Sequence, residues 1–423
     1  MIDVGREPGP IVSSMRVREG VDQAEPFAVS VDATSVRALK EEPQRLDEPS
    51  FRRFLMSCVQ SNASDITIQS GIQPRCEIYG RKYRASRRAW TTTDVNMVLA
   101  ELYGDANAVA EINRGEVLDF SYELTQADGI RQRFRVNATG IFGREGAGVE
   151  ITIRVLPTKT PTWESVSLTE DIADAVLANN GVIVICGATG HGKSTTMAAM
   201  TRRWLEWKER PVKIVDLQAP IEYTYRDVLA DMEGSASIIG QSEIPRHVKT
   251  FAEGVRSALR RNPDIINVGE CRDLPTIQAT IEASLTGHLV YTTTHAGSVV
   301  EALRRLVMVF PGEQREGESF NLLTSLRFLM VQFLVERSDE PGRVPVREYL
   351  QITPELRSEL YNRHTDRWPE IVSELMASDG DGGPMRRRLE ADVESYFRRG
   401  VISEDSRRML MALQSWKGRG DVR

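Results

Sequence analysis

Hydrophobic and polar positions alternate in several short stretches between residues 51 and 155. Alternation with a period of two predicts half-buried β-strands. Residues 53–59 fit a short helix, and a second helix is expected at about 93–102. The predicted strands cover residues 65–68, 75–79, 117–123, 131–137 and 150–155, with Asp128-Gly129 as a turn signal between 117–123 and 131–137. We therefore expect a small α+β unit built on an antiparallel sheet.

The pattern changes after the polar stretch Pro157-Thr-Lys-Thr-Pro161. Short apolar runs now alternate with longer helical stretches, which argues for a mainly parallel sheet covered on both faces. The predicted strands are 182–186, 212–217, 265–268 and 288–292. The predicted helices are 193–207, 247–261, 274–286 and 299–310.

Four segments follow from these patterns. Residues 1–45 contain four prolines among many charges and predict a mostly flexible tail. Residues 46–157 form the α+β unit, and residues 158–350 form the α/β unit, with the proline-flanked stretch as the boundary. Residues 351–423 are rich in Arg and Glu and predict a purely helical region, interrupted by a loop at 379–384.

Composition narrows the function classes. The 423-residue chain has a formal net charge of −6, so it lacks a global basic signature for nucleic acid. No apolar run approaches the roughly 20 residues of a membrane span, and the N-terminus lacks the pattern of a signal peptide. Cys58, Cys76, Cys186 and Cys271 are scattered, which favours free buried thiols and a cytoplasmic location.

A glycine-rich loop carries the strongest chemical signal. An apolar strand runs into Gly187-Ala188-Thr189-Gly190-His191-Gly192-Lys193-Ser194-Thr195, and a helix opens at Lys193. Backbone N–H groups of such a loop point at phosphate oxygens, and the helix N-terminus adds its positive end. Lys193 would reach the β- and γ-phosphates and Ser194 would ligate Mg²⁺. The cofactors expected are ATP and Mg²⁺, against the alternative of a chance glycine loop.

His191 is an unusual residue in such a loop. It either faces solvent on the outer side of the loop or touches the nucleotide or a neighbouring subunit.

A second piece of the site is Asp264-Ile-Ile-Asn-Val-Gly-Glu270. P-loop enzymes place an acid opposite the phosphates at the end of an apolar strand. Gly269 stands where the usual Asp of an Asp-Glu pair would be, so Glu270 would act alone, on Mg²⁺ through water or on the attacking water. The alternative is an ordinary surface glutamate.

Several motifs resemble those of one family. Leu259-Arg-Arg-Asn-Pro-Asp-Ile-Ile-Asn-Val-Gly-Glu-Cys-Arg-Asp273 resembles the Walker B motif of secretion ATPases, and the stretch from Ala283 to His295 resembles their His box. Ala63-Ser-Asp-Ile-Thr-Ile68 is similar to the motif that opens their N-terminal domain. The chain is therefore similar to the PilT/GspE-like traffic ATPase superfamily, and within it to the DotB and conjugative TraJ branch of type IVB systems.

The resemblance implies a RecA-like P-loop ATPase core, a smaller PAS-like N-terminal α+β domain that clamps the nucleotide, and a helical C-terminal region. It also implies a ring hexamer with ATP between the two domains. Glu270 would be the Walker B acid and a Mg²⁺ ligand with Ser194. His288 and His295 would sense the γ-phosphate. N-terminal-domain arginines would reach the nucleotide, and the matching positions are Arg133, Arg135 and Arg154.

The two histidines also have a physical argument of their own. Both are expected near an end of the strand at 288–292, and ligands of open α/β sheets bind at strand ends. Two ordinary strand-end histidines are the alternative. A zinc site is not expected, because no third ligand lies nearby at metal-binding spacing.

The family's acidic box, Glu-Asp-Pro-x-Glu, is altered here to Gln218-Ala219-Pro220-Ile221-Glu222. Glutamine cannot act as a base, although it can orient water. Either Glu222 or Glu270 must then be the base, or turnover is slow. The alternative is that Gln218 is a neutral substitution at a strand end.

Two arginine groups have open roles. Arg256, Arg260 and Arg261 are expected either at a subunit interface or the γ-phosphate, or on a solvated helix face. For Arg386-Arg-Arg388 a solvated helix face is favoured over contact with DNA, acidic lipid or a partner.

The expected function is a hexameric ATPase motor of a type IV secretion or transfer system, docked on inner-membrane complex proteins from the cytoplasmic side. A pilus assembly or retraction ATPase is the alternative within the superfamily. A RecA-like motor on nucleic acid is the alternative outside it, although direct nucleic-acid binding is not expected. A small-molecule kinase would leave the His box unexplained.

Overall fold

The structure is a computed structural model that describes residues 46–78, 81–125, 129, 131–144, 146–231, 235–340, 342–378 and 383–417. The predicted tail at 1–45 and the turn residue Asp128 lie outside these ranges, as does most of the predicted loop at 379–384.

An antiparallel sheet of six strands forms the N-terminal unit, as predicted. Its strand order is β3-β2-β1-β6-β5-β4. The strands are β1 (Ala63–Gln69), β2 (Arg75–Ile78), β3 (Arg81–Arg84), β4 (Leu118–Thr125), β5 (Arg131–Gly143) and β6 (Gly146–Val155). The helices α1 (Glu48–Gln60), α2 (Thr92–Tyr103) and α3 (Ala108–Asn113) pack on it around Phe54, Leu99 and Phe134. The prediction did not include β3 and α3.

Capping side chains fix where the two longer helices of this unit begin. Asp47 precedes α1 and accepts a hydrogen bond from the Ser50 backbone, while the Ser50 hydroxyl accepts one from the Asp47 backbone. Thr91 and Asp94 make the same reciprocal pair at the start of α2. Each pair satisfies donors that a helix N-terminus otherwise leaves open.

The second unit is built on a sheet of eight strands in the order β14-β13-β12-β7-β11-β10-β8-β9. The six strands from β12 to β9 run parallel to one another, β13 pairs antiparallel with β12, and β14 pairs antiparallel with β13. The parallel strands are β7 (Gly181–Cys186), β8 (Lys213–Gln218), β9 (Ile238–Glu243), β10 (Ile265–Val268), β11 (Leu289–Thr294) and β12 (Leu326–Glu336). The antiparallel strands are β13 (Arg343–Gln351) and β14 (Arg386–Arg387).

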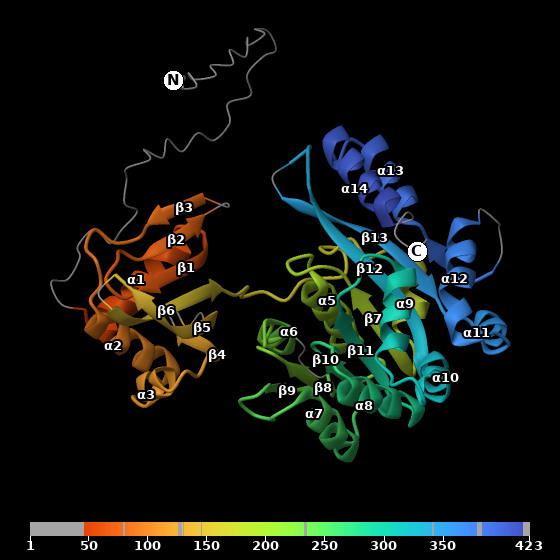
Figure 1. The fold of residues 1–423 in the computed structure, drawn as a ribbon, viewed down its shortest axis with the longest axis horizontal. Helices are drawn as coiled ribbons and strands as arrows, with labels where there is room; N and C mark the ends of the chain where they lie inside the picture. The colour runs from red at the N-terminus through yellow and green to blue at the C-terminus, as the bar shows by residue number, and fades with distance from the viewer. Residues whose placement is uncertain are drawn as a thin grey trace, which may run out of the picture.

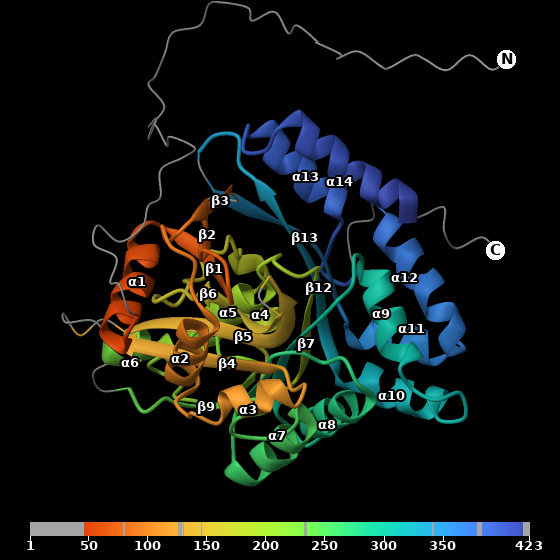
Figure 2. The same ribbon diagram turned by 60° about the vertical axis from the view of Figure 1, so that its left-hand side comes forward.

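Helices cover both faces of this sheet (Figures 1 and 2). In β7, Val182, Val184 and Cys186 face one core, whereas Ile183 and Ile185 face the other. The first core includes buried side chains from seven helices, which are α7 (Phe251–Ala258), α8 (Leu274–Leu285), α9 (Val299–Met308), α10 (Arg315–Ser325), α11 (Pro354–Tyr361), α12 (Trp368–Ala377) and α13 (Leu389–Arg398). The second core includes buried side chains from α4 (Ala173–Val176), α5 (Lys193–Glu206) and α6 (Arg226–Asp231). The 3-10 turns are Glu170–Ile172, Leu259–Arg261 and Thr365–Arg367, and α14 (Glu404–Lys417) packs on α13. Two buried faces explain the uninterrupted apolar strands.

Four strands of the large sheet, β9, β12, β13 and β14, were not predicted. The expectation of a purely helical C-terminal region is wrong, because Arg386 and Arg387 form β14 against Leu350 and Tyr349 of β13. This short pairing extends the sheet by one strand at its edge.

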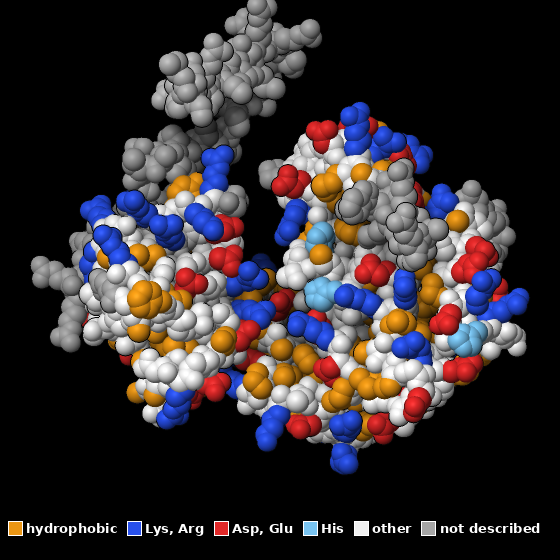
Figure 3. All heavy atoms as spheres, in the orientation of Figure 1, with side chains coloured by type: hydrophobic (Ala, Val, Ile, Leu, Met, Phe, Trp, Pro, Cys, Tyr) orange, Lys and Arg blue, Asp and Glu red, His pale blue; other side chains and the backbone are white. Residues whose placement is uncertain are grey.

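The stretch between the two sheets is anchored at its far end. The Thr160 backbone N–H and hydroxyl donate to the Asp227 carboxylate of α6 at 2.9 and 2.6 Å. Arg202 of α5 donates to the Thr160 carbonyl at 2.7 Å. Figure 3 shows the opening between the two units.

Candidate functional site

The glycine-rich loop joins β7 to α5, and three of its glycines adopt positive φ. The values are +149° at Gly187, +81° at Gly190 and +72° at Gly192. A Cβ at Gly187 would lie 2.5 Å from the carbonyl oxygen of Gln332. Gly187 is therefore needed for both its backbone conformation and its close approach to β12. The loop delivers the chain to Lys193, the first residue of α5.

Lys193 lies inside the curve of this loop. Its Nζ donates to the carbonyls of Gly187 at 2.7 Å and Ala188 at 3.1 Å, and lies 3.4 Å from His295 Nδ1. Burial lowers the pKa of Lys193, while the Glu270 carboxylate acts in the opposite direction. A partly desolvated cation at a loop of this kind is suited to binding phosphate oxygens.

Glu270 and His295 lie beside this lysine. Glu270 follows β10 and His295 follows β11, the strand between β10 and β7. His295 Nε2 is 3.1 Å from Glu270 Oε1, and Arg272 forms an ion pair with the same carboxylate. The carboxyl ends of three adjacent strands thus bring Lys193, Glu270 and His295 together.

The altered acidic box adds Glu222 and two amides that bind buried Asp216. The Glu222 charge acts on both Lys193 and Arg135. Gln218 Nε2 donates to Asp216 Oδ1 at 2.6 Å, and Gln241 Nε2 donates to Asp216 Oδ2 at 2.7 Å. Burial raises the pKa of Asp216, and these hydrogen bonds oppose the shift. Sequence reasoning missed Asp216 and Gln241, although a lone acid in the apolar run 214–217 was a usable signal.

The glycine-rich loop contacts β12, which sequence reasoning did not anticipate. Leu334 N–H donates to His191 Nδ1 at 2.9 Å, and Gln332 Nε2 donates to the His191 carbonyl at 2.7 Å. The His191 ring also meets the Phe333 ring edge-on, at 5.7 Å between centroids. Neither expected role of His191 describes these contacts, because the ring binds the backbone of its own chain.

The three candidate arginines lie on the face of the N-terminal sheet opposite its core, but in different surroundings. Arg135 binds Asp119 with two hydrogen bonds of 3.2 and 2.7 Å, and its charge interacts with Glu222. Arg154 is exposed and pairs with Asp65 at 2.8 Å. Buried Arg133 donates to the Ile221 carbonyl at 2.6 Å, and burial lowers its pKa. Arg133 thus contacts the acidic box directly through the Ile221 carbonyl, whereas Arg135 interacts with it through the charge of Glu222.

His288 is separated from this site. It precedes the amino end of β11, where its carbonyl accepts from Gly181 N–H and its Nδ1 lies 2.9 Å from the Ala283 carbonyl. Seven residues of nearly extended chain put it roughly 20 Å from His295. Both histidines lie next to an end of β11, but at opposite ends, and only the carboxyl end with His295 faces the loop.

The other arginine groups have structural contacts. Arg260 donates to the Arg256 carbonyl at 3.0 Å, and the Arg261 side chain packs over Gly240 of β9. In the run at 386–388, Arg387 pairs with Asp392 at 3.0 Å and Arg388 donates to the Ala377 carbonyl at 3.1 Å. The favoured solvated helix face for this run is wrong, because its first two residues form β14.

All four cysteines are buried and free, as predicted. Among the residues that the structure describes, no group of three or more His, Cys, Asp and Glu side chains could hold a metal ion by itself. A Mg²⁺ ion that shares phosphate oxygens needs only one or two protein oxygens, and the Ser194 hydroxyl and Glu270 carboxylate are oxygen donors of the right type. Within the described ranges no helix is long and apolar enough to cross a membrane.

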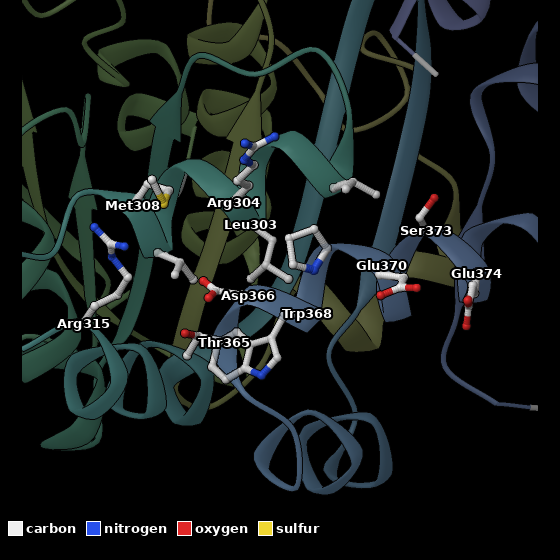
Figure 4. Close-up of a pocket in the computed structure, with 13 residues that line it drawn as sticks. Leu303, Arg304, Met308, Arg315, Thr365, Asp366, Trp368, Glu370, Ser373 and Glu374 are labelled. Carbon is white, nitrogen blue, oxygen red and sulfur yellow. The ribbon is translucent and has the colours of Figure 1, made fainter. Parts of the chain in front are cut away.

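A groove of about 700 Å³ lies away from this site, between α9 and α12 (Figure 4). Leu303 and Trp368 contribute apolar surface, Arg304 and Arg315 line one side, and Glu370 and Glu374 line the α12 side. No residue of the glycine-rich loop lines it.

Comparisons with known proteins agree with this architecture. The model of the family "Type II/IV secretion system protein" matches residues 129–368, more than half of the chain. The "Uncharacterized protein YggR" of Escherichia coli is 33% identical over 314 residues, which are 74% of this chain and 90% of that protein. The "Type IV pilus retractation ATPase PilT" of Pseudomonas aeruginosa is 29% identical over 356 residues, covering 84% of this chain and 96% of PilT.

Among solved structures, the Legionella pneumophila ATPase DotB superposes with a TM-score of 0.79 at 35% identity, covering 89% of this chain and 99% of DotB. The RecA-like core and the motifs at Lys193 and Glu270 lie within the region that the family model matches. The chain belongs to the type II/IV secretion system family of ATPases, with similarity to its DotB branch.

Proposed function

We propose that the chain is a motor that hydrolyses ATP with Mg²⁺ to drive a type IV secretion or transfer system of the type IVB or conjugative kind. The observation that carries this proposal is the meeting of Lys193, Glu270 and His295 at the carboxyl ends of three adjacent strands. Similarity to DotB supports the type IVB assignment. Similarity to PilT keeps a pilus motor as the alternative.

The glycine-rich loop would hold the triphosphate. Its backbone N–H groups and the α5 N-terminus would bind phosphate oxygens, and Lys193 would turn from the loop carbonyls to the β- and γ-phosphates. Ser194 and Glu270 would hold Mg²⁺, which supplies positive charge to the transferring phosphoryl group. Lys193 needs little movement, because its Nζ already lies inside the loop.

Glu222 is our candidate for the general base. Glu270 is held beside Lys193 by His295 and Arg272, and a carboxylate fixed in this position suits a Mg²⁺ ligand. Glu222 would accept a proton from the attacking water while the water oxygen bonds to the γ-phosphorus and the bond to the ADP oxygen breaks. His295 would report the γ-phosphate, since it contacts both Lys193 and Glu270.

Arginines of the N-terminal unit would complete the site. We take residues 46–157 as the unit that clamps the nucleotide and residues 158–350 as the motor core. Arg135 would exchange Asp119 for phosphate oxygens, and Arg154 would exchange Asp65. Arginine so placed can stabilise the transferring phosphoryl group by orders of magnitude in rate. Loss of the γ-phosphate would return these arginines to their carboxylates and move the units apart.

Three variants test the site. We expect Lys193→Ala to abolish ATP turnover, with exposed Lys208→Ala as the control at the wild-type rate. Glu222→Gln should bind Mg²⁺ and ATP normally but turn over about 10²–10⁴-fold more slowly. Glu270→Gln should weaken nucleotide binding selectively in the presence of Mg²⁺. Unimpaired hydrolysis by Lys193→Ala would refute the site assignment.

Assembly and partner class need separate tests. We propose a homohexamer at the cytoplasmic side of the inner membrane, joined to membrane-complex proteins. Sedimentation with Mg²⁺ and a non-hydrolysable ATP analogue should give hexamers, and monomers alone at micromolar concentration would count against a ring.

ATP turnover should not respond to single-stranded DNA. Strong stimulation would instead favour a nucleic-acid-translocating motor.

A further inference from the structure

Gln332 of β12 is 1% exposed and binds the glycine-rich loop on both sides of Lys193. Its Nε2 donates to the His191 carbonyl at 2.7 Å, two residues before Lys193. Its Oε1 accepts from Thr196 Oγ1 at 2.9 Å, in the first turn of α5. One buried amide therefore fixes both the end of the loop and the start of the helix.

The neighbouring backbone of β12 strengthens this attachment. Leu334 N–H donates to His191 Nδ1, so both the ring and the carbonyl of His191 are bound to β12. A Cβ at Gly192 would lie 3.1 Å from Gln332 Nε2, which shows how closely the amide approaches the loop. This contact region is distinct from the strands that contribute Glu270 and His295.

A buried arginine holds Gln332 from the other side. Arg347 of β13 is 5% exposed, and its Nε donates to Gln332 Oε1 at 2.9 Å. Its Nη1 donates to the Ser167 carbonyl at 2.7 Å, and its Nη2 donates to the Val166 carbonyl. Three oxygen acceptors thus fix the guanidinium, and Gln332 Oε1 receives two donors.

The same arginine connects to the C-terminal helices. Arg347 N–H donates to Asp392 Oδ2 at 2.8 Å, and Arg387 Nε lies 3.0 Å from Asp392 Oδ1. Asp392 belongs to α13 and is 5% exposed. A continuous set of buried hydrogen bonds therefore runs from α13 through β13 and β12 to the glycine-rich loop.

We propose that Gln332 is a positioning residue for ATP binding, and that Arg347 and Asp392 link the C-terminal helices to the loop through it. The inference rests on the proposed ATPase function. Phosphate binding requires the loop N–H groups to be held in one geometry, and small displacements of such groups are costly. Removing the amide leaves Thr196 Oγ1, Arg347 Nε and the His191 carbonyl without this partner, so the loop loses its attachment to β12 at two points.

The test compares two changes at Gln332. Gln332→Met removes both the amide donor and the amide acceptor at similar side-chain volume. Gln332→Glu keeps the two accepted hydrogen bonds and loses the donor to the His191 carbonyl. We expect about tenfold weaker binding of a fluorescent ADP analogue for Gln332→Met, and a smaller loss for Gln332→Glu. KM for ATP should rise with the Kd. Gln278→Met, at a half-buried glutamine of α8, is the control and should keep wild-type affinity.

A merely structural role predicts a different result. Thermal unfolding would then shift while the ADP-analogue Kd of the folded variants stayed at the wild-type value, and that result would overturn the inference. The binding readout needs no hydrolysis. Failure of the ATPase proposal would therefore appear in the wild type, as absent turnover or absent nucleotide binding, and not as a difference between variants.

Asp392→Ala tests the connection to α13. We expect its folded form to bind the ADP analogue several-fold more weakly, whereas Glu394→Ala on the same helix should not. Glu394 pairs with Arg407 at 2.6 Å and has no bond to β13 in the described structure. An unchanged Kd in folded Asp392→Ala would overturn the link to the C-terminal helices.

Discussion

Gln218, which departs from the family's acidic box, lies directly against Gly269. A Cβ at position 269 would lie 2.6 Å from Gln218 Oε1, so the glycine makes room for the amide. The amide in turn donates to buried Asp216. A carboxylate that burial disfavours is held here by amide donors. The amide at position 218 therefore makes a specific hydrogen bond to a buried carboxylate, which a neutral substitution would not require.

Gln218→Glu should destabilise the fold rather than restore the usual acidic box. The new carboxylate would face Asp216 at close range and lose the donated hydrogen bond, costing about 1–3 kcal/mol. The pKa of Asp216 is already raised by burial, and a second carboxylate would raise the pKa of the pair further. A carboxyl pair whose pKa is raised in the folded state binds its proton more tightly there than in the unfolded chain. This stabilises the folded variant at low pH, and the contribution is lost as pH rises through the folded pKa.

Urea unfolding at pH 5.5 and pH 8 checks this prediction. The stability deficit of Gln218→Glu should be smaller at the lower pH. An equal deficit at both values would show that the pair does not share a proton.

At the residue scale, the sequence predicted the site residues that follow directly from the motifs and from the ends of the parallel strands. Lys193, Glu270 and His295 each follow the carboxyl end of a parallel strand, and all three meet. His288 was expected at the start of its strand and lies there, but that start is the amino end, away from the glycine-rich loop. Gln332 and Arg347 escaped prediction because β12 and β13 were not predicted, and their hydrogen bonds join positions far apart in sequence.

At the element scale, α7 packs on β8 with a glycine at the contact. A Cβ at Gly254 would be 2.8 Å from Leu217 Cδ1, a distance that side chains do not tolerate without movement. Leu217 directly precedes Gln218, so the packing of α7 against Leu217 affects the position of the strand that leads into the acidic box. Helical patterning predicted α7, but the pattern alone did not report this spacing.

Gly254→Ala should therefore destabilise the protein by about 1–2 kcal/mol, because overpacking outweighs the gain in helix propensity. Gly317→Ala in α10 is the matched control, since nothing lies within 4 Å of the added methyl group. It should stabilise by about 0.5–1 kcal/mol. Chemical denaturation of both variants measures the difference, and stabilisation of both would contradict the packing argument.

The strand β7 and the helix α5, which flank the glycine-rich loop, were predicted well. Both faces of the parallel sheet are buried, so β7 is a clear apolar run in the sequence. The strands beside them were harder. β12 is an almost continuous apolar run, and such a run does not distinguish strand from buried helix. β9 is half-buried and polar, so it lacked a pattern.

At the scale of the whole molecule, polar contacts join the two units. Glu243 of β9 is 2% exposed and accepts from Ser121 Oγ at 2.7 Å and from the backbone N–H groups of Ser121 and Ile221 at 3.3 Å. Arg226 pairs with Glu123 at 2.7 Å. A cavity of about 860 Å³ lies beside these contacts. Interfaces of this kind allow the units to move relative to each other more readily than an apolar interface would.

Ser121→Ala should loosen this interface. It removes one hydrogen bond to a buried carboxylate, worth about 1.5–3 kcal/mol, and should speed proteolytic cleavage of the segment at 157–160 severalfold. Ser64→Ala is the control, since its hydroxyl is exposed and bonds to the Glu77 carbonyl at 3.3 Å. Cleavage of both variants at the wild-type rate would show that the Ser121 contact does not hold the units together.

The edge strand β3 has a consequence for how copies of the chain meet. Arg81, Lys82 and Arg84 are exposed along it, and Arg75 of β2 is exposed beside Arg84. An open strand edge invites pairing with the same edge of another molecule, and a row of like charges opposes it. The protein is thereby protected from continuing its N-terminal sheet into a fibre, and self-association is directed to side-chain surfaces that can separate again.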